Sequence, residues 1–129
     1  MIEISKTSGR LTIYLTAQPV GADWNIVVCG GDRPHIGAIA LASHVRPENS
    51  ENTCSLISLP NHREGEMAKR LATMLASRVN AAVCVSVGIH LENITGDEIL
   101  LANALVESLT LELISLVRQA VSLASIHNA

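Results

Sequence analysis

Hydrophobic and polar residues alternate through the first half of the chain, and this period of two is typical of β-strands. The clearest case is residues 11–16, in which two leucines and an isoleucine alternate with two threonines and a tyrosine. Four more strands are predicted at residues 2–4, 24–29, 35–45 and 53–59. Breaks rich in glycine, proline or polar residues are predicted at residues 18–21, 30–34 and 46–52.

The period changes near Pro60, after which apolar residues recur at helical spacing as far as Val79. Asn61 and Glu64 have the spacing of a capping box, so this helix is predicted to begin near Asn61. Residues 81–89 return to strand alternation. Valines and an isoleucine fall on one face of that strand and small residues on the other, which permits close approach by a helix or a ligand.

A second capping box at residues 95–98 predicts a final helix that runs to about Ala124. Its apolar positions are too widely distributed for a single stripe, so more than one of its faces must be buried. One face is expected to cover the sheet and another to meet a second copy of the chain. This pattern predicts a homodimer or a higher homo-oligomer.

The predicted order is β-β-β-β-β-α-β-α. It indicates an α+β fold with two layers, in which a mainly antiparallel sheet carries both helices on one face. A chain of 129 residues fits a single domain, so one domain is expected over residues 1–129.

Composition excludes several classes of partner. The net charge is −3 and no lysine or arginine block occurs, so no nucleic-acid partner is expected. One Trp, one Tyr and no Phe leave no platform for stacking on bases. No uninterrupted apolar run is long enough for a membrane helix, so no membrane association is expected. No secretory signal is evident either, and a cytoplasmic location is therefore expected. Three widely spaced cysteines without a C-x-x-C pair predict no zinc or disulfide framework.

Polar or special residues interrupt the apolar elements in three stretches at element ends, where binding residues tend to be held. The first contains Gly30, Gly31, Asp32, Arg33 and His35. One interpretation is an anion pocket, in which glycine backbone N–H groups and the Arg33 guanidinium hold the ligand. The other is a tight β-turn that uses glycine for positive φ.

The second stretch contains His62, Arg63 and Glu64 at the predicted helix start. One interpretation is a phosphate site at the helix N-terminus, and the other is ordinary helix capping. The third contains His90 after a buried strand. His35, His62 and His90 would form an imidazole metal site if they converged. No metal is expected, because single histidines so far apart in the sequence rarely converge by chance. No nucleophile motif accompanies them, so no catalytic residue is predicted.

In their order and spacing, these stretches resemble the prenylated-flavin chaperone-like family, the small D-type subunit associated with gallate-type and hydroxybenzoate-type decarboxylases. That family is similar in fold to the proteasome-assembly chaperones. The matching residues are 30–38, 62–64 and 88–94, and the resemblance extends from about Trp24 to Ile114. The family usually has Gly-His-Lys-Glu at residues 61–64 and often Asp at Glu92, so this chain departs from it at both places.

The resemblance implies a non-catalytic chaperone that binds prenylated flavin mononucleotide transiently and hands it to a UbiD-like decarboxylase catalytic subunit, or helps that subunit mature. The implied cofactor-binding residues are Gly30, Gly31, Asp32, Arg33, His35, His62, Arg63, Glu64 and His90. Two alternatives stay open: a protein–protein assembly chaperone without a small ligand, and a small histidine- or metal-dependent enzyme.

Six members of this set are expected to lie around one pocket, because burying unsatisfied polar groups separately is costly: Arg33, His35, His62, Arg63, Glu64 and His90. Without a ligand, Glu64 is expected to pair with Arg33 or Arg63. Only Trp24 and Tyr14 are available to stack on a flavin ring.

Overall fold

The computed structural model describes residues 1–44, 54–60 and 62–127, and its elements occur in the predicted order. The strands and helices are β1 Ile2–Ser8, β2 Leu11–Val20, β3 Asp23–Gly31, β4 Ala38–Ala42, β5 Cys54–Ser58, α1 Gly65–Val79, β6 Val83–His90 and α2 Gly96–His127. The predicted α+β class is therefore confirmed.

The six strands form one sheet in the order β1-β2-β3-β6-β4-β5. Neighbouring strands are antiparallel except β3 and β6, which run parallel. Because parallel strands end at the same edge of a sheet, Gly31 at the end of β3 lies beside His90 at the end of β6. Two of the three polar stretches therefore meet at this edge.

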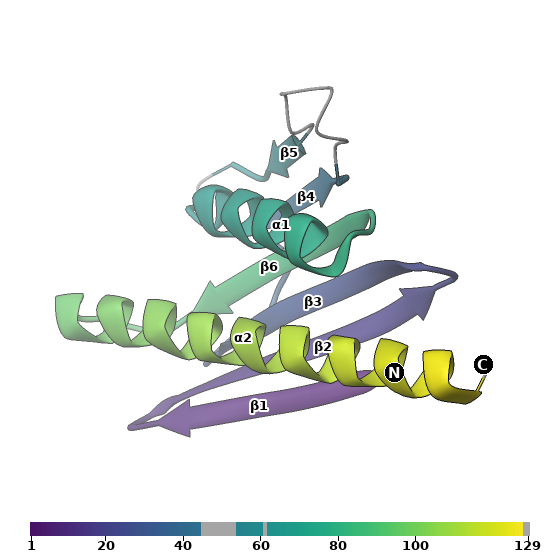
Figure 1. Ribbon diagram of the computed structural model, residues 1–129. Coiled ribbons are helices and arrows are strands. Elements are labelled where there is room, and N and C mark those ends of the chain that lie inside the picture. The colour runs from purple at the N-terminus through teal and green to yellow at the C-terminus, as the bar shows by residue number, and fades with distance from the viewer. Residues whose placement is uncertain (45–53, 61, 128–129) are drawn as a thin grey trace.

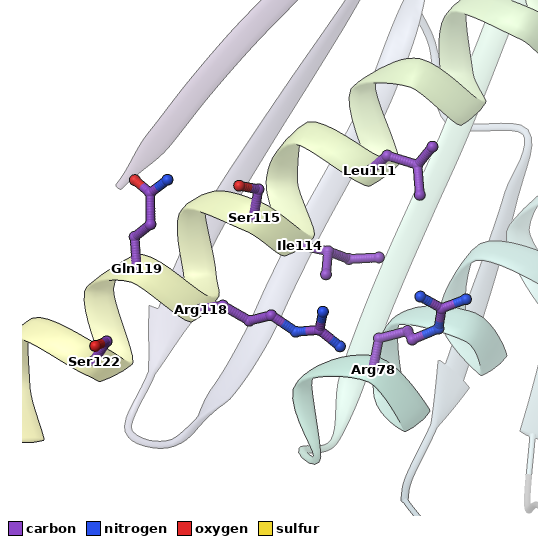
Figure 2. Close-up of a pocket in the computed structure, with 7 residues that line it drawn as sticks. All are labelled: Arg78, Leu111, Ile114, Ser115, Arg118, Gln119 and Ser122. Carbon is purple, nitrogen blue, oxygen red and sulfur yellow. The ribbon is translucent and has the colours of Figure 1, made fainter.

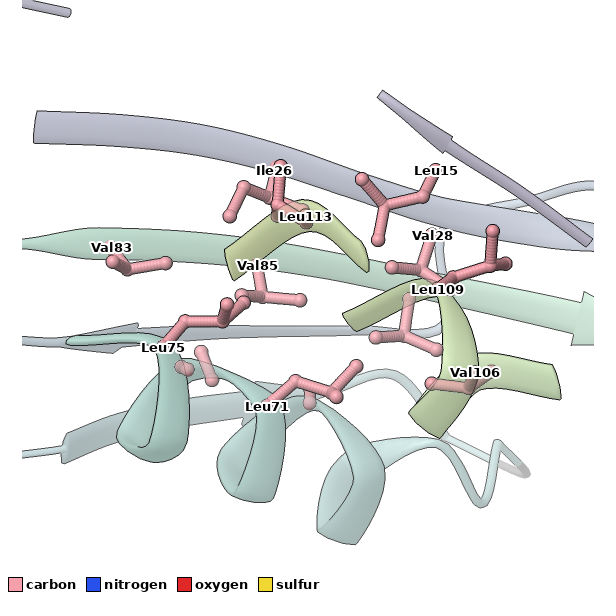
Figure 3. Packing of buried hydrophobic residues seen from close by; sticks show 14 of the residues in the cluster. Leu15, Ile26, Val28, Leu71, Leu75, Val83, Val85, Val106, Leu109 and Leu113 are labelled. Atoms are coloured by element: carbon pink, nitrogen blue, oxygen red, sulfur yellow. The ribbon is translucent and has the colours of Figure 1, made fainter. Parts of the chain in front are cut away.

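Both helices cover the same face of the sheet, as predicted (Figure 1). Helix α1 packs on β4, β5 and β6, and α2 packs on β1 and β2. The alternating valines of β6 point into the core, whereas Cys84 and Ser86 face the other side. Figure 3 shows this core at the junction of the sheet with both helices, and its labelled side chains are Leu15, Ile26, Val28, Leu71, Leu75, Val83, Val85, Val106, Leu109 and Leu113.

Helix α2 buries one stripe and exposes another. By length and composition alone, Gly96–Ala124 would suffice to cross a membrane, with a mean hydropathy of 1.7. In the fold, however, Val106, Leu109 and Leu113 of this helix are buried in the core. Packing on the sheet therefore accounts for one apolar stripe of α2, while Leu100, Leu111 and Val121 remain exposed.

The break predicted at residues 18–21 is too early. Strand β2 continues through Pro19 to Val20, and the hairpin turn follows at Gly21, which has a φ of 61°. Strand β1 pairs with β2 no further than Ala17. Pro19 therefore lies on a stretch with a free edge, where the missing N–H is tolerated.

The predicted boundaries around residues 30–45 are also wrong. Gly30 and Gly31 belong to β3, and β4 is restricted to Ala38–Ala42. A Cβ on Gly30 would lie 2.2 Å from the Thr12 carbonyl oxygen, so glycine is needed for close approach to β2. The connection between β3 and β4 is thus residues 32–37. The polar loop predicted at 46–52 lies outside the described residues.

Only one of the two predicted capping boxes can be confirmed. Helix α1 begins at Gly65, and its N-cap residue Glu64 makes no side-chain capping bond, whereas Asn61 lies outside the described residues. At the start of α2, Thr95 Oγ1 accepts the Glu98 N–H at 3.2 Å and Glu98 Oε1 accepts the Thr95 N–H at 3.1 Å. The second box therefore forms as predicted.

Glu98 also receives two hydrogen bonds from Arg10, at 2.7 and 2.9 Å. These bonds, with those from Thr95, lower the pKa of Glu98 from 4.5 to about 2. Because the folded-state pKa is depressed, the stabilisation is present above pH 4.5 and is lost as the pH falls toward 2.

We therefore expect Glu98→Gln to make the free energy of unfolding less dependent on pH between about 2 and 4.5 than it is in the parent. Urea denaturation at a series of pH values measures this dependence. Glu107→Gln is the matched control, because exposed Glu107 on the same helix makes no ion pair with a described residue. Parallel pH profiles for the parent and Glu98→Gln would contradict the expectation.

Candidate functional site

The three polar stretches meet around one end of β6. The 32–37 connection crosses this strand, and Gly37 N–H donates to the Val87 carbonyl at 2.9 Å. A Cβ on Gly88 would lie only 1.6 Å from the His35 carbonyl oxygen. Gly88 therefore lets the backbone of the connection lie directly on the strand, which places His35 between the end of β6 and the start of α1.

A cavity of about 630 Å³ lies between the end of β6 and the first turns of α1 and α2. Its basic side chains are His35, His62, Arg63, Arg70 and His90, and its acidic ones are Glu64 and Glu66. Its apolar wall consists of Met67, Ile89, Ile94, Ile99 and Ala102. A smaller cavity of about 360 Å³ adjoins it, sharing His35, His62 and His90 and adding Arg33.

His35, His62 and Glu64 form a compact cluster in the wall of this cavity. His35 Nε2 lies 3.2 Å from His62 Nδ1 and 3.0 Å from Glu64 Oε1. The other ring nitrogen, His35 Nδ1, lies 3.0 Å from the Arg33 carbonyl oxygen. A carbonyl oxygen only accepts hydrogen bonds, so His35 Nδ1 carries the hydrogen. Glu64 Oε2 is buried and has no hydrogen-bond partner among the described residues.

Arg33, His90 and Glu92 form a second, more exposed cluster. His90 Nε2 lies 3.0 Å from Glu92 Oε2 and 3.1 Å from Arg33 Nη2. The hydrogen bond from His90, together with the charges of His90 and Arg33, holds the pKa of Glu92 below its usual value. His90 therefore contacts Arg33 and Glu92, apart from the pair formed by His35 and His62.

The pairing expected for Glu64 is wrong. Its carboxylate contacts His35 and His62, while Arg33 pairs with Glu92 at 3.8 Å. The reason is the backbone at Gly37, where a Cβ would lie 2.4 Å from Glu64 Oε2. The missing side chain leaves room for the Glu64 carboxylate next to the histidines.

Three predicted site residues do not line either cavity. Gly30 and Gly31 are paired within the sheet, and Gly31 has a φ of 77° and packs against the His90 backbone. Asp32 Oδ2 accepts the Glu92 N–H at 2.9 Å, and the Asp32 N–H donates to the His90 carbonyl at 2.7 Å. These contacts hold the end of β3 against the end of β6, so these residues stabilise the backbone next to the site without lining a cavity.

The sequence analysis missed Arg70, Glu66 and Met67 on the cavity side of α1. Their positions could have been predicted from the sequence, since they lie three, four and seven residues after Arg63. Residues at this spacing share one face of a helix. The residues contributed by the start of α2, such as Ile99 and Asn103, have no comparable signal, since only tertiary packing brings α2 to the cavity.

Neither aromatic residue lines the cavity. Tyr14 is exposed on the face of the sheet opposite the helices, and Trp24 pairs with Val83 at the far end of β3 and β6. Neither of the two aromatic residues available to stack on a flavin is therefore placed to do so in this cavity.

A second pocket, of about 410 Å³, lies between the end of α1 and the middle of α2. Figure 2 shows Arg78 and Arg118 extending into the gap between the two helices, beside Leu111 and Ile114. None of the three polar stretches contributes to this pocket, and it contains no histidine or carboxylate. The histidine-lined cavity is therefore the candidate site.

Comparisons with known proteins show the family to which the chain belongs. A family model described as the prenylated flavin chaperone LpdD-like domain matches residues 7–118, which include all three polar stretches. Protein LpdD of Lactiplantibacillus plantarum is 28% identical over 104 residues, which cover 76% of this chain and 71% of that protein.

The fold is also similar to that of a chain in the crystal structure of a novel chaperone complex for yeast 20S proteasome assembly. The TM-score is 0.59 with 16% sequence identity, over 90% of this chain and 96% of the other. At this level of identity the likeness establishes the fold alone.

Proposed function

Because this chain belongs to the family of prenylated flavin chaperone LpdD-like domains, we propose that it binds prenylated flavin mononucleotide and hands it to a UbiD-like decarboxylase. The observation that carries the proposal is the cavity in which the three polar stretches meet, since it combines a cationic side with an aliphatic wall. Both are needed to bind a ligand with a phosphate at one end and a flat apolar ring at the other.

The phosphate would lie near Arg63 and Arg70. Both arginines line the cavity, Arg70 from α1 and Arg63 from the segment just before it, and no ion pair links either to a carboxylate among the described residues. The N-terminus of α1 adds a partial positive charge at the same place. Arginine is also well matched to phosphate, because its planar guanidinium donates two parallel hydrogen bonds.

The ring system would lie against Met67, Ile89 and Ile99. A cavity of about 630 Å³ falls within the range of cofactor pockets, and it is open to solvent on one side. The absence of a stacking partner favours binding that is weak enough to be reversed, as a handover requires. The decarboxylation chemistry that prenylated flavin supplies would take place in the enzyme, while this chain holds and orients the cofactor without turnover.

Exposed apolar side chains support a protein partner as well. Leu100, Leu111 and Val121 are exposed on α2, and Ile39 and Leu41 on the face of the sheet that no described helix covers. Large apolar side chains gathered on a surface mark interaction sites. We propose that these surfaces serve a homodimer or higher homo-oligomer and the decarboxylase, in the cytoplasm. The same surfaces would also serve an assembly chaperone without a small ligand, the alternative function.

The test is reconstitution with purified components. The chain is mixed with prenylated flavin mononucleotide, passed over a gel-filtration column, and then added to an apo-decarboxylase whose turnover of a hydroxylated benzoate is followed. We expect the cofactor to co-elute with the chain, which by itself has no turnover, and the loaded chain to activate the enzyme more than free cofactor at the same concentration. Light scattering on the same sample reads the oligomeric state.

Failure to co-elute at micromolar concentrations, or equal activation by free cofactor, would refute the handover. If the chain without cofactor raised the yield of folded decarboxylase instead, the assembly function would be favoured. A monomer by light scattering would refute the proposed homo-oligomer.

A further inference from the structure

We propose that His35, His62 and Glu64 bind a divalent transition-metal ion, with Zn²⁺ as the ion to test first. The three side chains offer ligand atoms that all lie within 4.8 Å of one another. The site borders the candidate cavity, but the proposal does not depend on flavin binding and is tested without it.

Two of the distances between the ligand atoms are close to those of a tetrahedral site. With metal–ligand bonds of about 2.0–2.1 Å, two ligand atoms of a tetrahedron lie about 3.3 Å apart. His35 Nε2 is 3.2 Å from His62 Nδ1 and 3.0 Å from Glu64 Oε1, and His62 Nδ1 is 3.7 Å from Glu64 Oε2. An ion would therefore contact both histidines and Glu64 once the carboxylate turns one oxygen toward both ring nitrogens.

The hydrogen-bonding pattern leaves a position for a cation. Because His35 Nδ1 donates its hydrogen to the Arg33 carbonyl, the neutral ring presents the Nε2 lone pair to the Glu64 carboxylate. Two electron-rich atoms 3.0 Å apart repel unless a proton or a metal ion lies between them. Glu64 Oε2, which is buried without a hydrogen-bond partner among the described residues, offers a further lone pair beside them.

The supporting contacts are those that histidine ligands usually have. A metal-binding histidine normally donates its other ring N–H to a carbonyl or carboxylate, which fixes the tautomer and the ring orientation. The bond from His35 Nδ1 to the Arg33 carbonyl has this geometry, at 3.0 Å. Glu64 is held at the N-cap of α1, with room for its carboxylate at Gly37.

Two histidines and one carboxylate are a ligand set of zinc sites that keep a coordination position open. The set differs from the three histidines considered in the sequence analysis, because His90 bonds to Arg33 and Glu92 and Glu64 takes the third place. The expectation of no metal followed from the absence of a short-spaced ligand motif, whereas these ligands come from segments that only the fold brings together.

Calorimetric titration of the chelator-treated protein with Zn²⁺ tests the proposal. Visible absorption after titration with Co²⁺ reports the coordination geometry. We expect one ion per chain and the absorption of tetrahedral Co²⁺ in the parent. His62→Ala and Glu64→Gln should each weaken binding by about 100-fold or more, since each removes a direct ligand, and outer-shell changes alone cost about 10–100-fold. His44→Ala is the matched control, because exposed His44 does not belong to the cluster.

Thermal denaturation with and without Zn²⁺ separates loss of a ligand from loss of the fold. Zn²⁺ should raise the Tm of the parent and of His44→Ala, and should leave that of a folded His62→Ala unchanged. Stoichiometric binding that survives both ligand substitutions would overturn the proposal. So would the absence of binding in the parent, which would mean that His35 and Glu64 form an imidazolium–carboxylate pair only.

Discussion

Replacing Gly88 with alanine will destabilise the fold and displace the 32–37 connection from β6. The new Cβ would lie 1.6 Å from the His35 carbonyl oxygen and 2.3 Å from its carbon. Because both atoms belong to the backbone, no side-chain rotation relieves the overlap, and the connection itself must move. Overpacking of this kind typically costs about 1–3 kcal/mol, and a clash with backbone belongs at the upper end of that range.

The displacement would also separate His35 from His62 and Glu64, so the cluster in the cavity wall should be lost together with stability. Urea denaturation followed by circular dichroism measures the first effect, and Zn²⁺ titration the second. Gly96→Ala is the matched control, since a Cβ there would meet nothing within 4 Å at the first residue of α2. An unchanged unfolding midpoint for Gly88→Ala would show that the connection does not lie against β6 as described.

The double substitution of Arg63 and Arg70 by alanine is expected to reduce affinity for flavin mononucleotide by about 100-fold or more. A hydrogen bond to a charged group contributes about 1.5–3 kcal/mol, and each arginine would supply at least one to the phosphate. Arg33→Ala should have a smaller effect, because Arg33 lines only the adjoining cavity and is paired with Glu92. Of the two places at which a phosphate was expected from the sequence, Arg33 and the start of the helix, we therefore favour the second.

Riboflavin, which lacks the phosphate, is the control ligand, and its affinity should change little in the double variant. Lys69→Ala is the control variant, since Lys69 carries the same charge on α1 but does not line the cavity. Fluorescence titration of the parent, the double variant and Lys69→Ala with each of the two ligands measures the affinities. Undiminished binding of the nucleotide by the double variant would show that the phosphate does not bind at this end of the cavity. Equal losses for both ligands would mean that the arginines act on the ring and not on the phosphate.

Periodicity in the sequence determined which elements form and which side of each is buried. The alternation in β6 placed Val83, Val85 and Val87 in the core because successive strand residues point to opposite faces. The capping box at Thr95 and Glu98 was equally predictable, since its bonds join residues only three positions apart. These features depend on local backbone geometry, which neighbouring residues specify.

Boundaries were less predictable wherever a neighbouring element decides them. Pro19 belongs to a part of β2 that β1 does not reach, since the two strands pair no further than Ala17, and α1 begins at Gly65 while the Glu64 side chain turns to the histidines. Local propensity gives no information about either circumstance. The three polar stretches were recognised in the sequence as sites at element ends, but their contacts were not.

The contacts within the site were decided by tertiary structure alone. Strand β6 inserts between β3 and β4, and its parallel pairing with β3 brings His90 beside Gly31 and places the 32–37 connection across Gly88. A period of two identifies the buried face of a strand but not its neighbours, which are selected by the burial of the whole sheet against both helices. For this reason the sequence analysis could name four candidate site residues, His35, His62, Glu64 and His90. Only the fold shows that His35, His62 and Glu64 form one cluster, while His90 contacts Arg33 and Glu92.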